Sequence, residues 1–212
     1  VYGNKMTTID AACNSFGQTF NVNMMQMMSA YCSIINGGML YQPHIVKRIE
    51  SANGEVVKEN KATLVRQTVT MSTSKLLRRY LKSTVETGTA KKVAVTGYSV
   101  AGKTGTAQKS PRSENKWLIS FIGHAPADNP KFAIYVIIDE PDGTTGTSGS
   151  SADVLTLSHD ILEKLLPYMS VYKDSLEPVT DTGTAEDDYT VDGVPEGSIQ
   201  NTATENLQNM PS

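Results

Sequence analysis

The sequence predicts an α+β domain in which helices pack on an antiparallel sheet, and three observations support this fold class. Two amphipathic helical patterns precede a run of three strand-like segments, and a third helical pattern follows it. The connectors between the strand-like segments are too short to hold crossover helices, so the strands should be antiparallel neighbours. Helices before and after such a sheet are typical of a layered α+β arrangement.

The first helix is predicted over residues 21–36 (NVNMMQMMSAYCSIIN). Five side chains recur at helical spacing and are expected on one buried face: Val22, Met25, Met28, Cys32 and Ile35. Asn21 or Asn23 is expected to cap the start of this helix, and the Gly37-Gly38 pair is expected to end it.

A β-hairpin is predicted next, with strands over residues 44–49 and 55–57. Its turn at residues 51–54 contains Asn-Gly, a pair that tolerates the positive φ of tight turns. The second helix is predicted over residues 73–87 (TSKLLRRYLKSTVET). Ser72 is expected to cap this helix, and Gly88 is expected to end it.

Three strands are predicted over residues 99–108, 117–123 and 132–139. The first is small and Gly-rich, and the third (FAIYVIID) is dense in β-branched and aromatic residues. The last helix is predicted over residues 152–166. Its expected apolar face consists of Val154, Leu157, Ile161, Leu162 and Leu165.

The composition excludes several classes of protein. The 212 residues are 39% hydrophobic and carry a net charge of −3, which fits a globular core and excludes a strongly basic nucleic-acid binder. The longest apolar run, at residues 132–138, is far shorter than the roughly 20 residues that cross a bilayer. Cys13 and Cys32 cannot form a zinc site alone and are expected to be free, buried thiols. His44, His124 and His159 show no metal-ligand spacing.

The charge distribution predicts two regions. Residues 171–212 hold nine acidic residues and one lysine, a charge of −8, and few large aliphatic side chains. Such a segment buries too little apolar area to offset its ordering entropy. We therefore expect a folded portion at residues 1–170 and an acidic, low-complexity flexible tail at residues 171–212.

Residues 97–104 (GYSVAGKT) match the phosphate-loop pattern G-x-x-x-x-G-K-[ST], which indicates ATP or GTP binding in other proteins. A phosphate loop requires a helix directly after its Lys-Thr pair, because the N–H groups at the helix start bind the phosphates. Here GTAQKSP follows at residues 105–111, and Gly and Thr are poor helix formers. The sequence therefore argues against a P-loop NTPase and favours a strand through Lys103 and Thr104.

Two further patterns are interpreted as structural. Residues 72–75 (STSK) match S-x-x-K, the nucleophile pattern of penicillin-recognising enzymes, but a capping Ser followed by an exposed Lys explains them as well. Residues 51–53 and 113–115 match S-x-N. The first lies in the predicted turn and the second in a polar connector, so neither is expected in an active site.

The Lys103-Thr104-Gly105-Thr106 segment remains as the candidate binding strand. Alternation in a strand projects Lys103 to one face and Thr104 to the other. Lys103 offers a positive charge and Thr104 a hydroxyl for a carboxylate. Gly105 permits close approach of a ligand backbone, and the Thr106 amide can point at a developing oxyanion. An extended peptide could add to such an edge as a further strand.

Five blocks in order resemble the penicillin-binding transpeptidases: SFGQ at 15–18, NGG at 36–38 with YQPHIV at 41–46, VETGTA at 85–90, VAGKTGTAQ at 100–108 and FIGHAP at 121–126. The resemblance covers about residues 8–169 and is greatest to the monofunctional class B enzymes of Gram-positive, clostridia-like bacteria. Thr19 stands where many relatives have Gly, so local adjustment is expected there.

The resemblance implies a serine-type acyl transfer. In this family an active-site Ser attacks the penultimate D-Ala carbonyl of a peptidoglycan stem peptide, and an amine of a neighbouring stem resolves the acyl-enzyme. β-Lactams mimic D-Ala-D-Ala. Lys103 would lie beside the nucleophile, Thr104 and Thr106 would hold the carboxylate, and the Thr106 amide would complete the oxyanion hole. No metal or organic cofactor is expected.

In the family the nucleophile and S-x-N motifs precede the SFGQ block, and here only residues 1–14 stand before that block. We therefore expect the chain to be the C-terminal portion of a transpeptidase domain with an incomplete N-terminal half, inactive alone and unable to form a penicillin adduct. A β-lactamase or D,D-carboxypeptidase of the same fold is an alternative. A non-catalytic structural fragment that completes its sheet with a second copy is another.

The resemblance also implies partners and a location. The expected partners are the D-Ala-D-Ala stem peptide, β-lactam antibiotics and the N-terminal part of the same protein. Nucleic acid is not expected as a partner, and a homo-oligomer is possible in the structural alternative. The substrate implies the extracytoplasmic side of the bacterial membrane, with an N-terminal anchor that this chain lacks.

Overall fold

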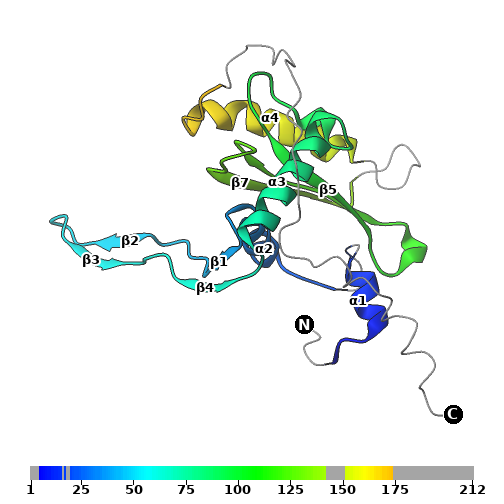
Figure 1. The fold of residues 1–212 in the computed structure, drawn as a ribbon, viewed down its shortest axis with the longest axis horizontal. Helices are drawn as coiled ribbons and strands as arrows, with labels where there is room; N and C mark the ends of the chain where they lie inside the picture. The colour runs from blue at the N-terminus through cyan, green and yellow to red at the C-terminus, as the bar shows by residue number, and fades with distance from the viewer. Residues whose placement is uncertain (1–4, 16, 18–19, 142–150, 174–212) are drawn as a thin grey trace, which may run out of the picture. The chain divides into compact units, whose positions relative to one another are not determined.

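The computed structural model describes residues 5–15, 17, 20–141 and 151–173. Strands β5 (Ala101–Gln108), β6 (Trp117–Ala125) and β7 (Phe132–Asp139) form an antiparallel sheet in the order β5-β6-β7 (Figure 1). The predicted α+β class and the antiparallel strand pairing are therefore confirmed. The acidic tail predicted at residues 171–212 falls outside the described residues from position 174 onward.

The core lies on one face of this sheet. Thr104, Phe121 and Val136 are opposite one another across the two ladders, so their side chains share this face. Phe121 and its neighbour Ile119 are fully buried. Helix α4 (Ala152–Tyr168) packs against β6 and β7 and contributes to the same apolar cluster.

The buried face of α4 differs from the predicted one. The structure buries Val154, Leu155, Ser158, Leu162 and Leu166. Leu157 and Ile161, expected inside, are 42% and 36% exposed. The Ser158 hydroxyl donates to the Val154 carbonyl at 2.6 Å, so a small polar residue enters the core with its donor satisfied. The predicted face was chosen from apolar residues alone, so it omitted Ser158 and was rotated away from the face that α4 buries.

Helix α2 (Met24–Ile35) begins at a capping box. The Asn23 side chain accepts the Gln26 N–H at 2.8 Å, and the Gln26 side chain accepts the Asn23 N–H at 3.0 Å. Of the two predicted caps, Asn23 is therefore the one used. Met25 and Val22 are 48% and 45% exposed, so the predicted buried face is wrong at its N-terminal end. The buried residues of α2 are Tyr31, Ser33 and Ile35, because the hydrogen bond of Tyr31 to His124 holds this part of the helix against β6.

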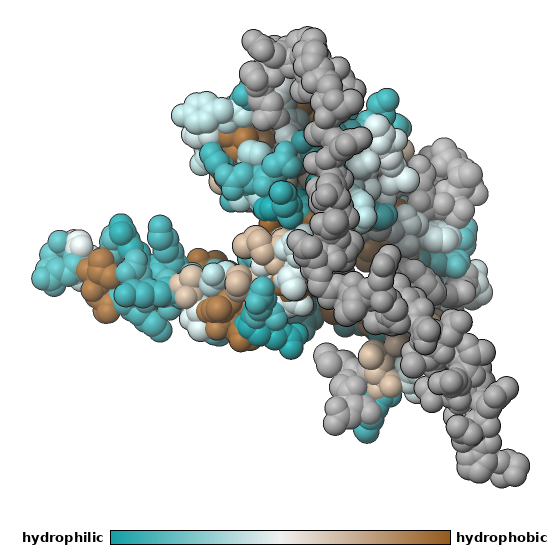
Figure 2. Space-filling view, in the orientation of Figure 1, coloured by the Kyte–Doolittle hydropathy of each residue, from teal (hydrophilic) through white to brown (hydrophobic). Residues whose placement is uncertain are grey.

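Two short antiparallel pairs lie between α2 and α3. The predicted hairpin is confirmed by β2 (Arg48–Glu50) and β3 (Val56–Glu59), and its turn uses Gly54 at φ 86°. The second pair, β1 (Met39–Tyr41) with β4 (Leu64–Gln67), was not predicted. Figure 2 shows hydrophobic residues interspersed with hydrophilic ones on this surface. Ile45 and Val57 are 92% and 68% exposed.

Helix α3 (Met71–Glu86) begins two residues before the predicted start. Its cap is Thr70, whose hydroxyl accepts the Thr73 N–H at 3.1 Å, so the prediction of Ser72 as the cap is wrong. Ser72 lies in the first turn and hydrogen-bonds the Thr70 hydroxyl. The chain also forms helix α1 (Thr8–Ser15) and the 3₁₀ turns η2 (Lys91–Val93) and η3 (Arg112–Glu114). Across these residues, no helix is long and apolar enough to cross a membrane.

Candidate functional site at the open edge of β5

Strand β5 forms an edge of its sheet. It pairs with β6 on one side, and the strand order places β5 at the end of the three strands. Strand β5 contains the K-T-G segment, Lys103 to Thr106, so the predicted strand at this position is confirmed. It continues unbroken through Lys103 and Thr104 to Gln108, whereas a phosphate loop would begin a helix there. The geometry therefore agrees with the sequence in arguing against a P-loop.

The register determines which backbone groups of β5 face the open edge. The Lys109 N–H donates to the Lys116 carbonyl at 2.8 Å, and hydrogen-bonded pairs alternate along an antiparallel ladder. Counting back through the register, Gly105 and Lys103 bond to β6. Thr106, Thr104 and Gly102 therefore turn their N–H and C=O groups outward.

Two side-chain contacts agree with this alternation. The Lys103 ammonium donates to the Thr104 carbonyl, with Nζ 3.0 Å from the oxygen. The Thr84 hydroxyl, from helix α3, donates to the Gly102 carbonyl. Both acceptors belong to residues that the register places outward, so the outward-facing backbone of β5 already binds hydrogen-bond donors within this chain.

Side chains along β5 alternate between the two faces of the sheet, as predicted. Lys103 is exposed and lies opposite Ile122, on the face that also carries His124. Thr104 lies opposite Phe121 on the other face and is half-buried, and Thr106 is exposed. The edge thus presents a cation, two hydroxyls and main-chain groups within four consecutive residues.

Packing against β6 favours glycine at two positions of β5, whether or not these residues also bind a ligand. A Cβ at Gly105 would lie 2.6 Å from the Ser120 hydroxyl oxygen on β6. A Cβ at Gly102 would meet the Phe121 ring and lie 2.6 Å from the Ile122 carbonyl oxygen. The Gly123 residue opposite Gly102 has the same ring 2.6 Å from its own Cβ position. The Phe121 ring therefore covers a Gly-Gly pair, which fixes the β5–β6 register.

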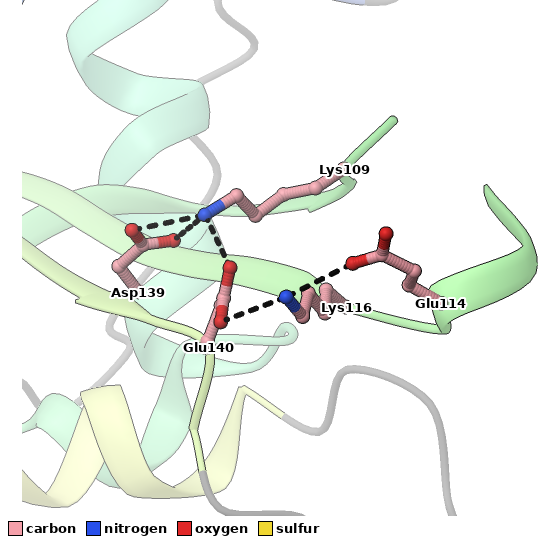
Figure 3. Close-up of polar contacts among 5 residues, drawn as sticks. All are labelled: Lys109, Glu114, Lys116, Asp139 and Glu140. Carbon is pink, nitrogen blue, oxygen red and sulfur yellow. Dashed lines mark hydrogen bonds and ion pairs between the residues drawn. The ribbon is translucent and has the colours of Figure 1, made fainter. Parts of the chain in front are cut away.

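An ion cluster fixes the far end of β5 (Figure 3). The Lys109 ammonium lies 2.9 Å from an Asp139 carboxylate oxygen and 2.7 Å from a Glu140 oxygen. Lys116 bridges Glu140 and Glu114 at 3.6 and 2.9 Å. The hydrogen bonds to Glu140 and then Asp139 raise the pKa of Lys109, and the bond to Lys109 lowers the pKa of Glu140. These ion pairs join β5 to the end of β7 and involve no K-T-G residue.

The structure places the other candidate motifs outside β5. Ser72 and Lys75 are exposed in the first turns of α3, while the buried Ser74 hydroxyl accepts the Gly37 N–H at 3.0 Å. Ser51 lies in the β2–β3 turn, where its hydroxyl hydrogen-bonds Asn53, and Ser113 lies in η3. The interpretation of these patterns as local structure agrees with their positions.

The histidines and cysteines form no metal cluster in the described part of the chain. His124 is fully buried and hydrogen-bonded to Tyr31, and His159 Nδ1 lies 3.0 Å from the Ala94 carbonyl oxygen. Cys13 and Cys32 are free but half-buried, so their predicted full burial is wrong. Burial raises the pKa of Cys32.

Sequence analysis missed two contacts near β5. Thr84 reaches the Gly102 carbonyl, and Tyr31 reaches His124, whose register partner is Ala101 at the start of β5. Both contacts join residues far apart in the sequence. The VETGTA block begins directly after Thr84, but no local pattern indicates which strand this hydroxyl contacts.

A family comparison identifies the class of domain to which this α+β fold belongs. The model of the penicillin binding protein transpeptidase domain matches residues 2–163, so the chain belongs to this family.

Individual relatives support the same assignment. The chain is 38% identical to stage V sporulation protein D of Bacillus subtilis, over 77% of this chain and 26% of that protein. It is 34% identical to the penicillin-binding protein PbpB of Mycolicibacterium smegmatis, over 71% of this chain and 25% of that protein. The chain therefore spans about a quarter of these relatives.

Solved structures show the same fold. Penicillin-binding protein 3 of Mycobacterium tuberculosis, complexed with aztreonam, superposes with a TM-score of 0.66 at 30% identity, covering 76% of this chain and 38% of that one. The transpeptidase domain of penicillin-binding protein 3 from Burkholderia pseudomallei gives 0.61 at 27% identity, over 78% and 48% of the two chains. The predicted family and fold are confirmed.

Proposed function

We propose that this chain supplies the substrate-binding strand of a peptidoglycan D,D-transpeptidase. The observation that carries the proposal is the outward-facing backbone of Thr104 and Thr106 beside Lys103 on an edge strand. A strand edge of this kind binds an extended peptide through main-chain hydrogen bonds. Membership of the transpeptidase family makes a stem peptide that ends in D-Ala-D-Ala the proposed ligand.

The proposed reaction is a two-step acyl transfer. A serine hydroxyl attacks the penultimate D-Ala carbonyl, the C–N bond to the terminal D-Ala breaks, and D-Ala leaves with the transferred proton. An amine of a second stem peptide then attacks the ester, forms the cross-link and returns the serine hydroxyl. β-Lactams acylate the same serine through their ring carbonyl, which keeps the opened leaving group tethered.

Each residue of the K-T-G segment has a proposed role. Lys103 supplies positive charge next to the nucleophile, which favours the deprotonated hydroxyl. The Thr104 and Thr106 hydroxyls bind the terminal carboxylate, and the Thr106 amide stabilises the oxyanion. Gly105 has no side chain, so the ligand backbone can approach the strand closely. No metal or organic cofactor has a part in this mechanism.

We propose that the nucleophile motif and the S-x-N motif lie in a part of the protein outside this chain. This accords with the 26% share of the sporulation protein that the chain covers. The proposed arrangement has residues 1–170 as the C-terminal portion of the domain, and an N-terminal membrane anchor that holds the domain outside the cytoplasm.

Fluorescent penicillin tests the proposal on the whole protein. We expect a covalent adduct that mass spectrometry maps to a serine outside this chain. Thr104→Val and Lys103→Met should each slow labelling at least about tenfold, because the first removes a hydroxyl that binds the ligand carboxylate and the second removes the positive charge beside the nucleophile. Lys91→Met, in η2 away from β5, is the matched control and should label at the wild-type rate.

Four results would contradict this proposal. An adduct on Ser72 would show that the S-x-x-K at residues 72–75 is the nucleophile motif. Unchanged labelling of Thr104→Val would remove the binding strand from the site. Hydrolysis of a D-Ala-D-Ala donor without cross-linking, when an acceptor amine is present, would instead identify a D,D-carboxypeptidase, and rapid turnover of penicillin would identify a β-lactamase.

A further inference from the structure

The end of helix α3 meets the start of strand β5 through one side chain. Thr84 lies in the last turn of α3 and is half-buried. Its hydroxyl donates to the carbonyl of Gly102, the outward-facing residue that precedes the K-T-G segment by one position. The neighbouring Val85 is 2% exposed and packs into the core, so the helix end that carries Thr84 is held in place.

The sequence around Thr84 builds this contact. The Ala90 N–H donates to the Thr84 carbonyl at 2.9 Å, so the chain turns back on the helix end after it leaves α3. A Cβ at Gly88 would lie 2.8 Å from the Thr84 Cα, so the turn requires glycine at this point. The VETGTA block at residues 85–90 therefore forms the turn that orients Thr84.

The Thr84 hydroxyl has two acceptors and one proton. Its Oγ1 lies 2.7 Å from the Leu81 carbonyl oxygen in its own helix and also within bonding distance of the Gly102 carbonyl. A hydroxyl donates one hydrogen bond at a time, so the bond to Gly102 competes with the bond to Leu81. When the proton points to Gly102, the open edge of β5 is tied to α3 just before Lys103.

We propose that Thr84 is a positioning residue for acyl transfer at the K-T-G strand. Thr84 occupies the first outward carbonyl of β5, two residues before the Thr104 backbone that the proposed function assigns to the ligand. By holding the Gly102 carbonyl, Thr84 also fixes the position of the Thr104 and Thr106 amides relative to the ligand. The inference rests on the proposed transpeptidase function and goes beyond it by assigning a residue outside the K-T-G segment.

The test measures acylation of the whole transpeptidase by fluorescent penicillin over a range of concentrations. Thr84→Val removes the hydroxyl and keeps the side-chain volume, and it should lower the maximal acylation rate constant about fivefold, the factor expected for one hydrogen bond. Thr84→Ser keeps the hydroxyl and should stay within about twofold of wild type. Thr87→Val is the matched control, because Thr87 lies at the same helix end and, among the residues that the structure describes, its exposed hydroxyl bonds only Ser83.

A purely structural role would lower the thermal midpoint of Thr84→Val and leave the maximal rate constant of the folded protein unchanged, which would overturn the inference. Equal losses in Thr84→Ser and Thr84→Val would also overturn it. If Thr84→Val does not fold, Thr84→Ala deletes the same hydroxyl with a smaller side chain and is judged by the same criterion. A wild-type protein that takes no label refutes the proposed function, and the inference with it. Slow labelling of Thr104→Val with normal labelling of Thr84→Val refutes the inference alone.

Discussion

The hydroxyl of Tyr31 lies 2.8 Å from Nδ1 of His124 inside the protein, and this hydrogen bond joins helix α2 to the central strand β6. Nε2 of His124 lies 3.0 Å from the Ala127 carbonyl oxygen, which can only accept, so Nε2 carries the proton. Nδ1 therefore accepts from Tyr31. Because His124 and Lys103 share a face of the sheet, this bond sets how α2 packs on the face that carries the Lys103 ammonium.

The first prediction concerns pH. Burial lowers the pKa of His124 from its ordinary 6.5 to about 4, against the opposing effect of the Ala127 hydrogen bond. The unfolded chain therefore binds more protons than the folded one between pH 6.5 and 4. The free energy of unfolding should fall as the pH drops through this window, by up to about 3 kcal/mol.

Urea unfolding of the transpeptidase domain between pH 7.5 and 4 would measure this loss. His124→Asn should flatten the pH dependence, and the exposed His44→Asn should leave it unchanged. Equal stability at both ends of the range would show that His124 is not protected from protonation.

The second prediction concerns the donor of the same bond. Tyr31→Phe keeps the ring and removes the hydroxyl, which leaves Nδ1 of His124 buried without its donor. The expected loss of unfolding free energy is about 1–3 kcal/mol. Tyr80→Phe is the control, because Tyr80 is 60% exposed on α3. Equal midpoints of denaturation for the two variants would refute the prediction.

The third prediction compares two glycines of β5. Gly102→Ala would press its Cβ on the Phe121 ring and the Ile122 carbonyl, and a buried ring and a backbone atom cannot move aside easily. It should cost about 1–3 kcal/mol of stability. Gly105→Ala meets only the Ser120 hydroxyl, which can rotate, and should cost less. Thermal unfolding of both variants checks the order, and the reverse order would contradict the packing described for Phe121.

The fourth prediction concerns the ion cluster at the end of β5. Lys109→Met removes the link to Asp139 and Glu140, yet all three groups face solvent, so the stability change should be small. Because salt screens exposed pairs, the difference from wild type should vanish near 1 M NaCl. Melting curves at low and high salt would measure it, and a large difference that persists in high salt would refute the prediction.

The fifth prediction concerns the chain produced alone. Large apolar side chains remain exposed on the hairpin region, with Ile45 at 92% and Val57 at 68%. Surface of this kind favours association, so the isolated chain should self-associate as its concentration rises. Size-exclusion chromatography with light scattering would detect this. Ile45→Lys combined with Val57→Lys should reduce association, whereas a monomer at every concentration would exclude the oligomerising alternative.

The sequence was informative where local patterns decide the structure. The strand that contains Lys103 and the hairpin turn at Gly54 follow from composition and turn chemistry, which act over a few residues. The start of α3 does not follow from composition, because Thr70 and Ser72 can both cap a helix and only the backbone geometry selects Thr70. The family assignment relied on five short blocks, and the K-T-G block was the one that placed the candidate site.

Tertiary contacts could not be predicted in the same way. The β1–β4 pair joins two short strands whose residues are mostly exposed, so neither has a periodic apolar signal. The buried face of α4 depends on Ser158 satisfying its own hydroxyl within the helix. The Thr84–Gly102 contact joins a helix end to a strand 18 residues later, and no local property of either residue indicates it.

The ring of Phe121 lies over Gly102 and Gly123 and limits how β5 can align with β6. Moving β5 by one position along β6 would bring Ala101 or Lys103 under the ring, where a side chain does not fit. The same shift would exchange the two faces of the strand and bury the lysine. An insertion or deletion within β5 would therefore disrupt its alignment with β6 on both sides of the Gly102–Gly123 pair.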